Sequence, residues 1–212
     1  MGPRSAVSGV LLLLALGAGA CTAGGERFGL LGRWLGRGGP PPVSQPVSVP
    51  LIDLDSTTLP WAQSEEYFIV VRRSCRTVDV YHWGDLIRRY PAVFGRNSAG
   101  SKLYEGDRRT PAGFYTIIEK RWHPRWARFM LLDYPNVTDG QRYAEAFESG
   151  DLPDENGHIP GIGGAIGIHG SDKQDLNARG IDWTLGCISL NNRDAIELDA
   201  LVPVGTPVWI HE

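Results

Sequence analysis

The sequence predicts a mainly β domain, sandwich-like in architecture, with one or two short helices. Short apolar or alternating runs recur from Tyr67 onward, and glycine and proline residues separate them. From Tyr67 onward, only two stretches, 139–148 and 192–201, place apolar residues at helical spacing. The chain has 212 residues, 42% of them hydrophobic, which suffices for one such domain plus additional segments. A formal net charge of −3 gives no reason to expect nucleic acid as a partner.

Residues 1–20 are typical of a secretory signal and lie outside the predicted domain. Arg4 provides a positive charge, Val10 to Leu16 form an apolar run, and small residues from Gly17 to Ala20 follow. The apolar run is too short to span a bilayer permanently. We therefore expect an exported protein of the cell envelope or periplasm.

Cys21, directly after these small residues, resembles the lipidated cysteine of a bacterial lipoprotein and predicts a membrane anchor. Ordinary signal cleavage after Ala20 is the alternative. Residues 21–64 are predicted to be a tether, because glycines and the run Pro40 to Pro42 interrupt helices and central strands. The stretch from Arg27 to Arg37 is compatible with a membrane-surface helix or with a flexible linker.

The folded domain is expected over residues 65–212. Predicted strands are Tyr67–Val71, Thr77–His82, Leu86–Phe94, Phe114–Ile118, Met130–Asp133 and Pro207–His211. Residues 121–164 have the weakest pattern. They contain the predicted strand Met130–Asp133 and the predicted helix 139–148, and the rest is compatible with a lid, a substrate wall or a solvated loop.

Two further strands carry the residues with the most specific chemistry. The apolar run from Ala165 to Ile168 leads to His169, and Gly186 precedes Cys187 and a second apolar run. If the two strands pair or lie side by side, the imidazole and the thiol meet at their ends. An imidazole can then take the thiol proton and produce the nucleophilic thiolate.

A glycine before the cysteine also lets backbone approach a substrate closely. We expect backbone N–H groups around Leu185, Gly186 and Cys187 to stabilise a developing oxyanion. These are the parts of an acyl-transfer site, with Cys187 as nucleophile, His169 as general base and acid, and Gly186 as an oxyanion donor.

The same residues resemble the L,D-transpeptidase catalytic domain family, the YkuD-type domain. The pair His169-Gly170 precedes the stretch Thr184-Leu185-Gly186-Cys187, with fourteen residues between His169 and Thr184. This arrangement is similar to the family signature. Lys102, the run from Gly106 to Tyr115 and the ending from Leu201 to Ile210 resemble other parts of that domain. The resemblance implies an L,D-transpeptidase-like β-sandwich.

The resemblance also implies a function, namely thioester formation on Cys187 with peptidoglycan stem peptides at meso-diaminopimelate. It implies no metal and no organic cofactor, and a wall-attached lipoprotein is one candidate acceptor. We assign to substrate binding Gly170, Thr184 and Lys102 from the signatures, and Trp183 and Tyr134 as groove aromatics.

Two positions depart from the family pattern. Leu185 stands where the family usually has histidine, and Ser189 stands where it often has arginine. These departures resemble the branch of murein L,D-endopeptidases and amidases. Transfer to an amine, hydrolysis of the same bonds, and wall binding without turnover therefore stay open as three hypotheses.

Two competing interpretations involve the same thiol. In an exported protein Cys75 and Cys187 are candidates for a disulfide, which a nucleophilic Cys187 excludes. A zinc site built from His123, His158, His169 and Cys187 is disfavoured, because no pair of them has the spacing of known zinc motifs.

Overall fold

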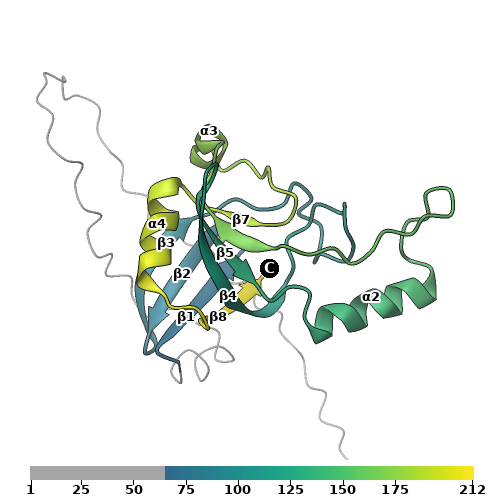
Figure 1. Ribbon diagram of the computed structural model, residues 1–212, viewed down its shortest axis with the longest axis horizontal. Coiled ribbons are helices and arrows are strands. Elements are labelled where there is room, and N and C mark those ends of the chain that lie inside the picture. Colours follow the sequence, from purple (N-terminus) through teal and green to yellow (C-terminus); the bar gives the residue numbers. More distant parts are fainter. Residues whose placement is uncertain (1–64) are drawn as a thin grey trace, which may run out of the picture. The chain divides into compact units, whose positions relative to one another are not determined.

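Eight strands and three helices make up the part of the chain that the computed structural model describes, residues 65–212 (Figure 1). The strands form one sheet in the order β3-β2-β1-β8-β4-β5-β6-β7. They are β1 (Tyr67–Arg72), β2 (Thr77–His82), β3 (Asp85–Pro91), β4 (Gly113–His123), β5 (Ala127–Leu132), β6 (Gly167–His169), β7 (Ile188–Ser189) and β8 (Pro207–His211). The helices are α2 (Val137–Ser149), α3 (Gln174–Ala178) and α4 (Asn192–Leu201).

The predicted mainly β class with few short helices is confirmed. The predicted signal (1–20), the lipidation of Cys21 and the tether (21–64) lie outside the described residues. Within residues 65–212, none of the helices has the length and apolar character needed to cross a bilayer.

The sheet curls so that its two ends approach each other. The segment after β3 leaves that edge and bridges to the opposite edge, where Val93 and Ser189 exchange backbone hydrogen bonds of 3.0 and 2.8 Å. Gly95 forms a second bridge with Thr184. The short β7 is therefore held from both sides, by β6 and by this returning segment.

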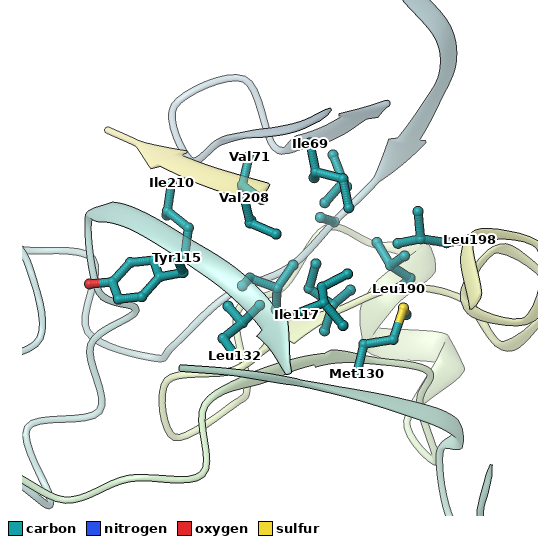
Figure 2. Packing of buried hydrophobic residues seen from close by; sticks show 14 of the residues in the cluster. Ile69, Val71, Tyr115, Ile117, Met130, Leu132, Leu190, Leu198, Val208 and Ile210 are labelled. Atoms are coloured by element: carbon teal, nitrogen blue, oxygen red, sulfur yellow. The ribbon is translucent and has the colours of Figure 1, made fainter. Parts of the chain in front are cut away.

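The main hydrophobic core lies inside the curled sheet (Figure 2). Side chains from β1, β4, β5, β7 and β8 converge there, and α4 contributes Ala195 and Leu198, each fully buried. Residues that the figure labels include Ile69, Val71, Tyr115, Ile117, Met130, Leu132, Leu190, Leu198, Val208 and Ile210. Burial of this apolar surface is the dominant stabilising contribution to such a domain.

Strand β1 is apolar on both faces, which explains its unbroken hydrophobic sequence. Ile69 and Val71 enter the main core, whereas Phe68 and Val70 join a smaller cluster with Tyr81 on the other face. Successive side chains of a strand point to opposite faces, so a strand between two apolar layers has no polar alternation.

The structure extends β4 well beyond its predicted end at Ile118. The strand continues to His123, where a tight turn leads into β5, and Ala127 has a φ of 58°. Its outer half is largely exposed and charged, and antiparallel pairing with β5 maintains it. The apolar pattern on which the prediction rested is absent from this half.

Helix α2 begins two residues before its predicted start, because Asn136 caps it. Asn136 Oδ1 accepts from the Asp139 N–H, and the Asp139 carboxylate accepts from the Asn136 N–H. Such a capping box satisfies N–H groups that lack partners within the helix. Gly150, in a left-handed conformation, ends the helix.

We predict that Ile117→Ala lowers the free energy of unfolding by about 2–5 kcal/mol, because it leaves a cavity in the main core. Ile117 is fully buried, whereas its neighbour Ile118 is 51% exposed. Ile118→Ala is thus the matched control, with an expected change within about 0.5 kcal/mol. Equal effects in a denaturant titration would contradict this description of the core.

Candidate active site

The two strands predicted to carry the site are neighbours in the sheet, with His169 at the end of β6 and Cys187 directly before β7. Strands β6 and β7 pair in parallel, with Ile168 opposite Ile188 and His169 opposite Ser189. Cys187 immediately precedes β7, and the Leu190 N–H donates to the His169 carbonyl at 2.8 Å. In this register Cys187 is level with Gly167, so the thiol lies at the start of the strand pair and His169 lies two residues further along, at its other end.

Each of the two side chains makes its own hydrogen bond to backbone. Cys187 Sγ donates to the Ala165 carbonyl at 3.6 Å, and His169 Nδ1–H donates to the Gly170 carbonyl at 2.5 Å. Within residues 65–212, no hydrogen bond joins the thiol to the imidazole. Cys187 is a free cysteine at a half-buried position, which excludes the alternative of a disulfide to Cys75.

His169 is only 2% exposed and lies among aromatic rings. Its ring stacks on Trp126 at a centroid distance of 4.4 Å, with Phe129 at 5.9 Å and the edge of Trp183 at 6.0 Å. Burial, with a smaller contribution from His123, lowers the pKa of His169 to about 4, although the Gly170 carbonyl and Asp172 partly oppose the shift. The imidazole is consequently neutral at pH 7.

Burial of the sulfur raises the pKa of the Cys187 thiol to about 11. The Gly167 N–H and the Lys102 ammonium act in the opposite direction, since both stabilise a thiolate. At pH 7 the site thus holds a neutral thiol and a neutral imidazole. A resting thiolate–imidazolium ion pair is disfavoured.

Thr184 fixes the turn that presents Cys187. Its hydroxyl donates to the Cys187 carbonyl at 2.7 Å and accepts from the Gly186 N–H at 3.2 Å. Gly186 has a φ of 141°, and a Cβ there would lie 2.7 Å from the Arg109 carbonyl oxygen. Only glycine fits this position without strain.

This geometry corrects the role predicted for Gly186. Its N–H is occupied by Thr184, so it is not available to an oxyanion. The N–H groups of Leu185 and Cys187, by contrast, have no acceptor among the described residues. They are the two backbone donors that this turn leaves unoccupied.

Gly170, predicted to contact substrate, is required for packing. Its N–H donates to the carbonyls of Trp126 and Arg128 at 3.0 and 3.2 Å. A Cβ would lie 2.3 Å from the Trp126 carbonyl oxygen and 2.4 Å from Asn192 Oδ1. The buried residue therefore offers a substrate neither a side chain nor a free N–H.

Lys102 is also committed internally. Its buried ammonium donates to Asp107 Oδ1 and to the Tyr104 carbonyl, each at 3.0 Å. Burial raises the pKa of Asp107, but the N–H groups of Leu103 and Arg109 together with Lys102 outweigh it, so the pKa lies below its usual value. Lys102 thus orders this loop and acts on the thiol through its charge.

The two predicted groove aromatics differ in position. Tyr134 is 5% exposed, belongs to the main core and donates its hydroxyl to the Ile162 carbonyl at 3.2 Å, which leaves little surface for a substrate. Trp183 lies beside His169 and donates its indole N–H to Asn177 Oδ1 at 2.8 Å. Lys173 lies over its ring at 4.8 Å.

Sequence reasoning missed Asn177 and the helix α3 that carries it. Asn177 Nδ2 donates to Ser189 Oγ at 3.1 Å, and Ser189 Oγ donates to the Gly170 carbonyl at 3.3 Å. Helix α3 buries no residue, so it has no apolar periodicity by which to recognise it. Among residues 65–212, no three His, Cys, Asp or Glu side chains form a set that could hold a metal ion.

We predict that His169 makes stability depend on pH between about 4 and 6.5. Its folded pKa lies below that of an unfolded histidine, so acid favours the unfolded state, and stability is lost as pH falls through this window. The contribution is on the order of 3 kcal/mol.

The measurement is the free energy of unfolding against pH for the wild type and for His169→Gln. The variant should show a flatter profile across this window, whatever its stability at neutral pH. His158→Gln, at an exposed position, is the control and should keep the wild-type slope. Parallel profiles for the wild type and His169→Gln would contradict the assignment.

Comparison with known proteins agrees with this architecture. The family described as "L,D-transpeptidase catalytic domain" (YkuD) matches residues 65–210. Similar solved structures include the cell-shape-determining protein Pgp2 of Campylobacter jejuni, with 22% identity, a TM-score of 0.50, and 69% of this chain and 47% of that chain covered. Bd1075 of Bdellovibrio bacteriovorus has 23% identity and a TM-score of 0.48, with 69% of this chain and 48% of that chain covered. An L,D-transpeptidase from Mycobacterium smegmatis has 17% identity and a TM-score of 0.46, with 69% of this chain and 59% of that chain covered.

This chain thus spans about half the length of the structures it resembles. No curated protein sequence matches it significantly. The family match covers most of the sequence, including both strands of the candidate site. The chain belongs to the L,D-transpeptidase catalytic domain family.

Proposed function

We propose that this protein is an exported cysteine acyltransferase that acts on the stem peptides of peptidoglycan. The main support is that Cys187 is a free, half-buried cysteine directly before β7, beside the strand that ends in His169. Family membership supports the same reaction class. The chemistry requires only a thiol and an imidazole.

In the first half-reaction, Cys187 Sγ attacks the carbonyl carbon of the meso-diaminopimelate residue. Its proton passes to His169 Nε2, which has the free lone pair because Nδ1–H is bonded to the Gly170 carbonyl. The carbon–nitrogen bond then breaks, and the leaving amine takes the proton from the imidazolium. A thioester remains on Cys187.

The electrostatics of the site support proton transfer during the attack. Burial raises the pKa of the thiol and lowers the pKa of the imidazole, so a separated ion pair is unfavourable before substrate binds. The thiol must also turn away from the Ala165 carbonyl to reach the imidazole. Catalytic hydrogen bonds often tighten only in the substrate complex.

The N–H groups of Leu185 and Cys187 are the proposed oxyanion donors, since the Gly186 N–H is bonded to Thr184. Two backbone donors held on a rigid turn stabilise the negative charge that develops on the carbonyl oxygen. The bonds from Thr184 supply that rigidity.

The acceptor determines the second half-reaction. Attack by an amine, from another stem peptide or a wall-attached lipoprotein, gives transfer, whereas attack by water gives hydrolysis, as in L,D-endopeptidases and amidases. Hydrolysis is the alternative suggested by Leu185 and Ser189. Ser189 is fully buried, so its hydroxyl does not line a substrate groove.

The proposed location is the cell envelope, with a lipid on Cys21 anchoring the chain to a membrane. A tether over residues 21–64 spans up to about 3.3 Å per residue when extended. The domain would then reach the cell wall from its anchor.

The test is incubation of the protein with a defined tetrapeptide stem, with and without an acceptor amine, followed by intact-mass and product-mass analysis. We expect a thioester adduct on Cys187 and an amide product when the amine is present. Cys187→Ala should give no adduct. His169→Gln should slow acylation by about 10²–10⁴-fold, because it removes the general base.

His158→Gln is the control and should leave acylation unchanged. If the wild-type protein releases only the product of attack by water, and forms no amide even when the amine is present, the protein is a hydrolase. Absence of any adduct on the wild-type protein would contradict enzymatic function and leave a wall-binding role.

A further inference from the structure

A chain of four hydrogen bonds runs from Trp183, through Asn177 of helix α3, to His169. The Trp183 indole N–H donates to Asn177 Oδ1 at 2.8 Å, and Asn177 Nδ2 donates to Ser189 Oγ at 3.1 Å. The Ser189 hydroxyl donates to the Gly170 carbonyl at 3.3 Å, and the same carbonyl accepts His169 Nδ1–H at 2.5 Å.

Trp183 fixes the orientation of the Asn177 amide, and the Gly170 carbonyl, which can only accept, fixes the direction of the two bonds made to it. An indole N–H can only donate, so the Asn177 carbonyl oxygen must face it and the amide nitrogen must face Ser189. The serine oxygen then accepts from Asn177, and its single hydrogen points to the Gly170 carbonyl. No other orientation of Asn177 satisfies both of its neighbours.

Most of this hydrogen-bond chain is buried, so the loss of one partner leaves a polar group unsatisfied. Ser189 has no exposed surface, Gly170 is buried and His169 is 2% exposed, so water cannot replace a missing partner. Helix α3 buries none of its residues, and apolar packing therefore does not account for its position. Its connection to the site is the side chain of Asn177.

We propose that Asn177 and Ser189 are positioning residues for His169. By fixing the Gly170 carbonyl, they keep the imidazole in the Nδ1–H tautomer and leave the Nε2 lone pair for the thiol proton. This inference rests on the proposed function as far as catalysis is concerned. The tautomer itself is independent of turnover.

The test compares Ser189→Ala, Asn177→Ala and Asn177→Asp. The aspartate retains an acceptor for Trp183 but can only accept from Ser189, so it draws the hydroxyl hydrogen away from Gly170. We expect each variant to lower kcat by about 10-fold with KM unchanged, as for other groups that orient a reacting side chain. The double variant Ser189→Ala/Asn177→Ala should cost no more than either single change.

Nitrogen-15 NMR of the histidine rings supplies the second readout. The wild-type His169 should show a Nδ1–H signal, and each variant should weaken it or show the Nε2–H tautomer. Trp183→Phe removes the indole donor while keeping a ring and should produce a smaller change of the same kind. Thr206→Val is the control, because it removes a buried hydroxyl that donates to the Pro203 carbonyl at 2.8 Å, outside this network.

Unchanged kcat and an unchanged Nδ1–H signal in Ser189→Ala and Asn177→Ala would overturn the inference. A fall in kcat without a change in that signal would also overturn it, since the two residues would then act other than through His169. If the wild-type protein is inactive but the variants alter the signal, the proposed function fails and the positioning role stands.

Discussion

The parallel pairing of β6 with β7 is the constraint on which the site depends. Two residues of β7 suffice because the strand is held on both sides, by β6 and by the segment that contains Val93. This closure fixes the register that sets His169 opposite Ser189 and leaves Cys187 at the strand start. A shift of one residue would turn the thiol to the other face of the sheet.

Burial gives the site its electrostatic character. The imidazole lies beneath aromatic rings and the sulfur is crowded by backbone, so both groups are held in their neutral forms. The positive charge of the Lys102 ammonium lowers the pKa of the Cys187 thiol, but this ammonium is itself paired with Asp107. Reactivity therefore depends on a well-placed general base more than on a preformed thiolate, which makes the tautomer of His169 important.

The sequence predicted those elements whose signal is local. The apolar run of β1 and the alternation in β2 located these strands closely, and the apolar runs before His169 and after Cys187 located the strand pair of the site. The outer half of β4 and helix α3 were missed. Their residues are largely exposed, and pairing or hydrogen bonding holds them in place of apolar burial.

Roles of individual backbone groups were beyond the reach of sequence reasoning. That Thr184 occupies the Gly186 N–H, or that Gly170 is needed for its close approach to Trp126, follows only from the folded register. The Asn177 side chain reaches the site across the fold, and its partner Ser189 lies on another element. A single sequence contains no periodic pattern for such contacts.

The most direct test of the central claim is the pH dependence of the alkylation of Cys187 by iodoacetamide, followed by intact mass. A neutral thiol beside a neutral imidazole predicts a rate that rises with pH toward an inflection near 11. An inflection below pH 7 would reveal a resting thiolate–imidazolium pair and contradict the account.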